Sequence, residues 1–189
     1  MDSPRKPEIL RHSAHLFRTN GYIDASMRKI AAAVGIDSAS LYSHLKSKGE
    51  ILQTICHWAA GKYLSNIESV EHSDQTPLKK LEAIIRMHIR MMIEEYDRAF
   101  VAEHEWNHLP EPHLSNFLNQ RRIYRRKLAD LVQDGILKGE IKKIDPYVAV
   151  ITFLSAIQGI EFWQRSQKNT SAEELEENMV RYLVGGLKM

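Results

Sequence analysis

The sequence predicts an all-α protein of about nine helices, and three observations support this class. Apolar residues recur with helical spacing along most of the 189 residues. No run alternates apolar and polar residues between hairpin turns, so no strand is expected. Glycine is scarce, with nine residues, and proline is scarcer, with six. Several of these prolines stand where a first helical turn tolerates them.

Spacing and capping signals place the helices in order along the chain. Pro77 and Pro146 each follow a capping residue, which marks two helix starts. Pro110 and Pro112 break the chain in the middle. The helices are expected at residues 5–20, 27–34, 38–45, 48–71, 76–95, 97–108, 112–138, 146–166 and 172–187.

Helix length changes near residue 47, because the first three helices are short and the later ones mostly long. This change predicts an N-terminal domain at 1–47, a connector helix at 48–71 and a C-terminal domain at 72–189. The first sixty residues carry eight Lys or Arg against five Asp or Glu, whereas the remainder is close to neutral. A basic N-terminal segment on a near-neutral body is typical of a small anion-binding module.

Composition narrows the class of protein. Apolar residues make up 43% and charged residues 26% of the chain, as in ordinary globular proteins. The single Cys56 excludes an internal disulfide and a cysteine-rich metal site. The first twenty residues contain no unbroken apolar run, so no signal peptide is expected. The apolar stretch Tyr147 to Trp163 is interrupted by polar residues, which argues against a membrane span. We therefore expect a cytoplasmic protein.

Residues 26–45 have the pattern of a helix-turn-helix. One helical stripe is formed at positions i, i+3, i+4 and i+7 by Met27, Ile30, Ala31 and Val34. Gly35 follows at once, where a left-handed residue can end the helix and turn the chain. Leu41 and Leu45 then face back toward the first stripe. In such a unit the second helix enters the major groove of DNA, although similar corners occur in proteins that bind no nucleic acid.

The polar side of residues 38–45 suits DNA, since its side chains are small or hydrogen-bonding and none is acidic. Tyr42 and His44 can donate to phosphate oxygens. Lys48 opens the next helix, so its ammonium and the free N–H groups there could bind one phosphate together. Ser26 caps the preceding helix, and Arg28 in its first turn can reach a phosphate or a base edge.

The stretch Ile9 to Ile55 resembles the N-terminal domain of the TetR family of bacterial repressors. The matching run is SMRKIAAAVGIDSASLYSHLKSK over residues 26–48, preceded by AHLF at 14–17 and by Gly21-Tyr22. Leu45 stands where Phe is usual, and Gly49 where an acid is usual; neither touches the expected groove face. The resemblance implies that the DNA-contacting positions are Ser26, Arg28, Ser38, Ala39, Ser40, Tyr42, His44 and Lys48.

The last two helices are too apolar to be fully exposed. Residues 147–163 are apolar all round, and residues 172–187 carry a stripe of Leu, Met and Val. We expect these helices to pair with their symmetry mates as a four-helix dimer interface, as in the resembled family. The alternative is that they form the core of a monomer.

Large, adaptable apolar side chains in the middle helices suggest a pocket for an apolar ligand, formed by Met87, Met91, Phe100, Trp106, Phe117 and Tyr124. An ordinary core is the alternative. The resemblance implies an inducer pocket in this region, and residues 106–139 are loosely similar to members that sense acyl-CoA thioesters. The basic run Arg121, Arg122, Arg125, Arg126 and Lys127 would suit the phosphates of such a ligand, although a solvated helix face is the commoner explanation.

A competing motif is H-E-x-x-H at His104, Glu105 and His108. On one helix this spacing would present two zinc ligands and a general base, as in a metal-dependent hydrolase or a metal sensor. Pro110 ends the helix one turn later, and no convincing third ligand follows. We therefore expect no enzyme, no cofactor and no metal. The prediction is a homodimeric, effector-responsive DNA-binding regulator, a repressor of a pseudo-palindromic operator, with no membrane partner.

Overall fold

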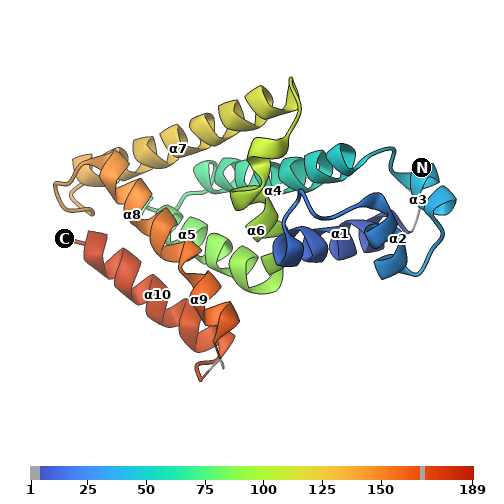
Figure 1. Ribbon diagram of the computed structural model, residues 1–189. Coiled ribbons are helices and arrows are strands. Elements are labelled where there is room, and N and C mark those ends of the chain that lie inside the picture. Colours follow the sequence, from blue (N-terminus) through green and yellow to red (C-terminus); the bar gives the residue numbers. More distant parts are fainter. Residues whose placement is uncertain (1–4, 167–168) are drawn as a thin grey trace. The chain divides into compact units, whose positions relative to one another are not determined.

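The computed structural model describes residues 5–166 and 169–189, and it confirms the all-α class (Figure 1). Among these residues the only strand-like pairing is an isolated bridge between Ile141 and Lys188. The elements in chain order are α1 (Lys6–Asn20), α2 (Met27–Val34), α3 (Ser38–His44), α4 (Lys48–Glu71), α5 (Pro77–Glu94), α6 (Tyr96–His104), the 3₁₀ helix η1 (Trp106–His108), α7 (His113–Leu137), α8 (Pro146–Gln158), α9 (Ile160–Arg165) and α10 (Ala172–Leu187).

Two of the expected helices are each interrupted once. The expected helix at 97–108 ends at His104, because the backbone of Glu105 leaves the helical region at φ −108° and ψ 1°. Three residues of 3₁₀ helix then lead to Pro110. The expected helix at 146–166 is divided into α8 and α9 at Gly159. The Gly159 N–H bonds to the carbonyls of Ser155 and Ala156, so the chain tightens at this point before α9 begins.

The chain forms two compact units, each assembled from two stretches of sequence. The first unit comprises residues up to Gly61 together with Tyr96–Asn119, and the second comprises Lys62–Glu95 together with Gln120–Met189. This grouping by packing does not test the functional division at 1–47, 48–71 and 72–189, which stays a prediction.

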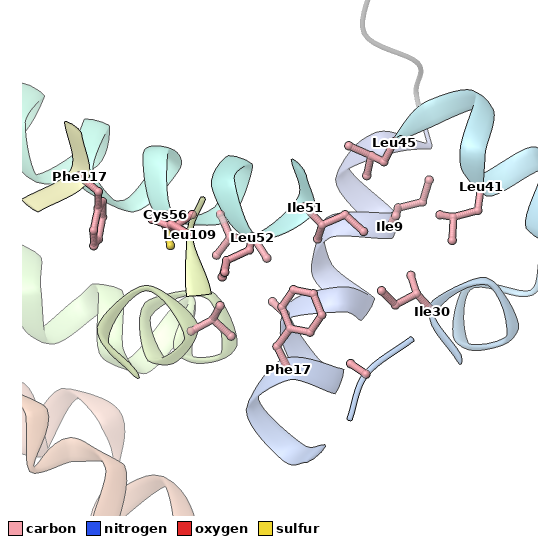
Figure 2. Packing of buried hydrophobic residues seen from close by; sticks show 14 of the residues in the cluster. Ile9, Phe17, Ile30, Leu41, Leu45, Ile51, Leu52, Cys56, Leu109 and Phe117 are labelled. Atoms are coloured by element: carbon pink, nitrogen blue, oxygen red, sulfur yellow. The ribbon is translucent and has the colours of Figure 1, made fainter. Parts of the chain in front are cut away.

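The core of the first unit joins the helix-turn-helix to α1 and the first half of α4. Ile9 and Phe17 of α1, Ile30 of α2 and Leu41 of α3 are all fully buried in one cluster, which Figure 2 shows from close by. These residues recur at helical spacing within their elements, so each helix turns its apolar stripe to the same interior. The cluster holds α2 and α3 in place and leaves their other sides free.

Helix α1 is also held to α6 by charge. Asp97, in the first turn of α6, accepts a hydrogen bond from the Arg18 side chain and lies 3.0 Å from Nδ1 of His15. The Arg18 guanidinium also lies over the ring of Tyr96, 5.0 Å from its centre. One acidic side chain therefore joins two basic residues of α1 to the start of α6.

Helix α5 is the centre of the second unit, and α8, α9 and α10 contact it (Figure 1). Its N-terminus is capped by Glu140, whose carboxylate accepts from the Leu78 N–H at 3.0 Å. Its buried side is formed by Pro77, Leu81, Ile84, Ile85, His88, Ile89, Met91 and Met92. On the opposite side Arg86 and Arg90 bond to Glu176, which ties α10 to α5.

The pair α8 and α10 carries a large exposed apolar face. Helix α8 buries only Ala149, Val150, Phe153 and Ile157. The large apolar side chains that remain exposed on α8, α9 and α10 are Tyr147, Val148, Ile151, Phe162 and Tyr182. Contrary to the expectation from its polar interruptions, Pro146–Arg165 is long and apolar enough to cross a membrane by length and composition, with 28% of the window buried. One such segment is weak evidence for a span.

Candidate nucleic-acid interface

Helix α2 and its turn form as the sequence predicts. Ser26 caps α2 by accepting from the Lys29 N–H at 3.2 Å. Gly35 has φ +74° and ψ +33°, and its N–H bonds back to the carbonyls of Ala31 and Ala32. A residue with a side chain is strained in this left-handed conformation, which explains a glycine at the turn.

Helix α3 begins at an acidic cap. The Asp37 carboxylate accepts from both the N–H and the hydroxyl of Ser40, at 2.8 Å and 2.6 Å. These hydrogen bonds lower the pKa of Asp37, so the carboxylate stays charged at neutral pH. The Asp37 carboxylate therefore caps the N-terminus of α3, where its negative charge would repel a phosphate. Phosphate contacts must come from other parts of the interface.

The predicted contact residues of α2 and α3 differ in how far they reach solvent. Arg28, Ser38, Ala39 and Tyr42 are exposed, and Tyr42 keeps 51% of its surface accessible. Ser40 and His44 are partly buried, and the Ser40 hydroxyl is already bonded to Asp37. The side of α3 away from the core therefore offers small side chains followed by one aromatic hydroxyl.

Lys48 lies against the segment that precedes α2. Its Nζ donates to the carbonyls of Tyr22 and Ile23, at 2.7 Å and 3.0 Å, and lies 4.3 Å from the centre of the Tyr22 ring. The sequence predicts a phosphate contact here, and the structure gives the ammonium a supporting role as well. An ammonium has three N–H donors, so one remains for a phosphate.

More polar groups at the start of α4 are hydrogen-bonded within the protein than the sequence indicates. The Ser47 hydroxyl accepts from the Glu50 N–H at 3.1 Å, and the Glu50 carboxylate accepts from the Lys46 N–H at 2.7 Å. The helix end therefore carries its own cap and an acid. The exposed side chain of Lys46, between α3 and α4, is a cation that the sequence analysis did not single out. Its position in the Lys-Ser-Lys run is the one signal that points to it.

The six predicted ligand-binding residues are divided between the two units. Met87, Met91 and Tyr124 belong to the second unit, while Phe100, Trp106 and Phe117 belong to the first. Met91, Phe117 and Tyr124 are buried, and the other three are partly buried. Their role in binding a ligand stays a prediction.

A polar cluster in the second unit joins Tyr124, a predicted ligand-binding residue, to His88 and Tyr63, which the sequence does not single out. His88 of α5 places Nε2 2.6 Å from the hydroxyl of Tyr124 on α7. The ring of Tyr63 on α4 stacks on the His88 ring with centres 4.3 Å apart and planes 11° apart. Burial lowers the pKa of His88 to about 3 and raises that of Tyr124, so both groups are neutral near pH 7. The one signal in the sequence that could have indicated this cluster is the position of His88 on an apolar helix face.

The H-E-x-x-H motif does not lie on one helix. His104 is the last residue of α6, whereas His108 ends η1 after the interruption at Glu105. His108 stacks on the ring of Tyr22 with centres 5.0 Å apart, and His104 lies against Phe100. Over residues 5–166 and 169–189, no three His, Cys, Asp or Glu side chains are placed to hold a metal. The two imidazoles of this motif, both among the described residues, therefore do not share one helix face as a zinc-hydrolase motif requires.

Two parts of the chain match known protein families. The description "Bacterial regulatory proteins, tetR family" matches residues 9–55, and "Tetracyclin repressor-like, C-terminal domain" matches residues 74–187. Together they span the helix-turn-helix and most of the remainder of the chain.

Individual proteins of known name are similar over nearly the whole length. The transcriptional repressor KstR2 of Mycolicibacterium smegmatis is 24% identical, over 97% of this chain and 90% of the repressor. The fatty acid metabolism regulator protein of Bacillus subtilis is 22% identical, over 97% of this chain and 96% of that protein.

Solved structures share the fold. The ketosteroid transcriptional regulator KstR2 of Mycobacterium tuberculosis superposes with a TM-score of 0.89 at 20% identity, over 100% of this chain and 97% of that one. AibR, solved in complex with isovaleryl coenzyme A and operator DNA, gives a TM-score of 0.82 at 24% identity, over 95% and 98%. The resemblance seen in residues 9–55 thus extends to the rest of the molecule, and the chain belongs to the TetR family of bacterial regulatory proteins.

Proposed function

We propose that this chain is a transcriptional repressor that binds a pseudo-palindromic operator as a homodimer and releases it when an effector binds. The observation that carries the proposal is the exposed face of α3, which presents small polar side chains and Tyr42 while its apolar face is fixed in the core. Repressors among the similar proteins support the same function.

In this proposal α3 lies in the major groove and its neighbours hold the sugar-phosphate backbone. Ser38 and Ala39 approach base edges, because they are small and exposed at the start of α3. Ser26, Arg28 and Tyr42 contact phosphates, joined by the remaining N–H of Lys48 and by Lys46. Ser40 and His44 contribute less than the sequence suggests, since both are partly buried.

The exposed face of α8 and α10 is the proposed dimer interface. Tyr147, Val148 and Ile151 on α8 lie on a helix that contacts α10, where Tyr182 is 86% exposed. Exposed aromatic and β-branched side chains gathered on two neighbouring helices are typical of a surface that another subunit covers. A two-fold pair also doubles the number of bases that one short helix can read.

The effector in this proposal is a small apolar molecule or an acyl-CoA thioester. AibR was solved with isovaleryl coenzyme A, and the Bacillus subtilis relative is named for fatty acid metabolism. Arg125 and Arg126 on α7 would bind the phosphates of such a molecule, whereas Lys127 is already paired with Glu71 at 2.6 Å. Effector binding would favour the conformations of the connector α4 that do not fit the operator. We further propose that the protein acts in the cytoplasm.

The experiment begins with the DNA sites that the purified protein selects from a random library. Gel-shift titrations of the selected site then measure its release by isovaleryl-CoA and decanoyl-CoA, with free decanoate and free coenzyme A as controls. We expect one thioester to release the DNA at concentrations where both controls leave it bound. Failure to select any DNA would overturn the proposed repressor, and release by free decanoate alone would overturn the thioester.

A further inference from the structure

The second unit contains a cluster of three polar ring side chains, two of which are buried. Three helices contribute to the His88–Tyr124–Tyr63 cluster: α5, α7 and α4. His88 is 6% exposed and Tyr124 is likewise 6% exposed, on helix faces that otherwise bury aliphatic side chains and methionine. Burying polar groups costs free energy that a leucine or phenylalanine would not cost.

Two further buried polar atoms belong to residues of α4 and α7, the helices that contribute Tyr63 and Tyr124 to this cluster. Asn66 follows Tyr63 by three residues on α4, and Gln120 precedes Tyr124 by four residues on α7, so each shares a helix face with a member of the cluster. The side-chain oxygens of Asn66 and Gln120 are buried, and neither has a hydrogen-bond partner among the described residues. A buried acceptor without a donor is unfavourable, so two of them on the helix faces that carry the cluster indicate a missing donor.

The cluster is uncharged. His88 and Tyr124 are both neutral near pH 7, so neither offers a charge to a ligand. A carboxylate has no hydrogen to donate to the unpaired oxygens of Asn66 and Gln120, so it would lose its hydration without satisfying them. A neutral amide or hydroxyl would lose much less and could donate to the unpaired oxygens.

We propose that Asn66, Gln120 and the His88–Tyr124 pair form the polar anchor of the effector site and bind an uncharged hydrogen-bond donor, an amide N–H or a hydroxyl, on an otherwise apolar molecule. This inference rests on the proposed effector-responsive function and narrows the chemistry of the effector. Tyr63 and Asn66 are on α4, the helix that follows the helix-turn-helix directly in the chain. A ligand held by them therefore contacts the connector itself.

Three probes with the same chain length test the anchor: decanamide donates and accepts, methyl decanoate only accepts, and decanoate is charged. Calorimetric titration of the full-length protein without DNA measures each affinity. We expect decanamide to bind about tenfold more tightly than methyl decanoate, as one well-placed hydrogen bond would give, and decanoate to bind most weakly. Equal affinities, tightest binding of decanoate, or no binding of decanamide would each overturn the proposal.

Two near-isosteric variants locate the anchor. Asn66→Leu and Gln120→Met should each reduce the preference for decanamide over methyl decanoate to near unity while methyl decanoate still binds. Asn178→Leu, at an exposed position on α10, is the matched control and should keep the preference. Thermal unfolding checks that every variant is folded. A preference that survives in both anchor variants would overturn the assignment, and if one variant fails to fold, the other decides.

Operator binding, measured on the same preparations without any probe, separates the two proposals. Intact operator binding together with absent amide selectivity would overturn the anchor alone. If the wild-type protein does not bind the operator, the proposed repressor is overturned. The calorimetric titrations, which contain no DNA, would still decide whether the anchor prefers decanamide.

Discussion

The ammonium of Lys48 donates to the main-chain carbonyl of Tyr22 at 2.7 Å, so the first residue of α4 holds the segment that leads into α2. The ring of Tyr22 lies under the same ammonium and packs edge-on against the buried Phe17. Lys48, for which the sequence predicts a phosphate contact, is therefore part of the framework that supports the helix-turn-helix.

Replacing Lys48 should affect both stability and DNA binding. Lys48→Ala removes two charge-assisted hydrogen bonds in a partly buried place, so we expect the free energy of unfolding to fall by about 1–2 kcal/mol. Lys46→Ala is the matched control, because the Lys46 side chain is exposed. This substitution should change the free energy of unfolding by less than about 0.5 kcal/mol. It should also reduce the slope of log binding constant against log salt concentration by about one. Chemical denaturation and titrations at several salt concentrations measure these effects. A Lys48→Ala protein as stable as the wild type would contradict the framework role.

Tyr42 should matter for DNA and not for the fold. Half of its surface is exposed, and it lies on the side of α3 away from the core. Tyr42→Phe removes only the hydroxyl, so we expect binding to weaken about three- to tenfold on selected and unrelated DNA alike, because a phosphate contact carries no sequence information. The unfolding temperature should stay unchanged. If Tyr42→Phe discriminates between DNA sequences differently from the wild type, then Tyr42 reads bases instead.

Stability should decrease in acid through the link between α5 and α10. The hydrogen bond from Arg90, with that from Arg86, holds the pKa of Glu176 below its ordinary 4.5. A lowered pKa favours the folded state when the carboxylate is ionised, so this contribution is present above pH 4.5 and is lost as the pH falls through the folded-state pKa. Glu176→Gln should therefore reduce the loss of stability between pH 6 and pH 3.

Denaturant midpoints across that pH range measure the effect, and Glu173→Gln, exposed on the same helix, is the control. At pH 7 we expect Glu176→Gln to cost about 1–2 kcal/mol, because the two arginines lose a charged partner. The same pH dependence in wild type and Glu176→Gln would show that the link contributes nothing to acid sensitivity.

The dimer interface can be tested by placing charge on α10. Tyr182→Arg puts a cation on each side of the proposed two-fold contact, so we expect monomers in sedimentation and much weaker operator binding. Ile123→Arg, at an exposed apolar position on α7, should leave the dimer intact. If the Tyr182→Arg protein remains dimeric, the dimer interface does not include this part of α10.

Local patterns in the sequence were sufficient to predict the helices and the turn of the DNA-binding unit. The stripe through Ile30 and the glycine at 35 determine α2 and its end, and both act over a few residues. The pairing of His88 with Tyr124 joins residues 36 positions apart, and no local pattern specifies it. The same holds for Lys48 and Tyr22, because the fold alone brings a charged side chain onto distant carbonyls.

The interruption at Glu105 marks another limit of local reasoning. H-E-x-x-H predicts two imidazoles on one helix face only if the helix continues, and here it ends between them. The apolar residues that α8 carries outside the core, in contrast, could be predicted, since the segment is apolar all round. Their role in a dimer interface stays a prediction.

The proposed repressor function requires that the first residues of α3 read the edges of base pairs. In vitro selection from a random DNA library, carried out in parallel with the wild type and with Ser38→Asn, tests this. Ser38 is exposed at the N-terminus of α3, so we expect the selected base to change at one position in each half-site, symmetrically, while the other positions stay the same. An identical consensus for the two proteins would contradict the claim that this end of α3 lies in the major groove.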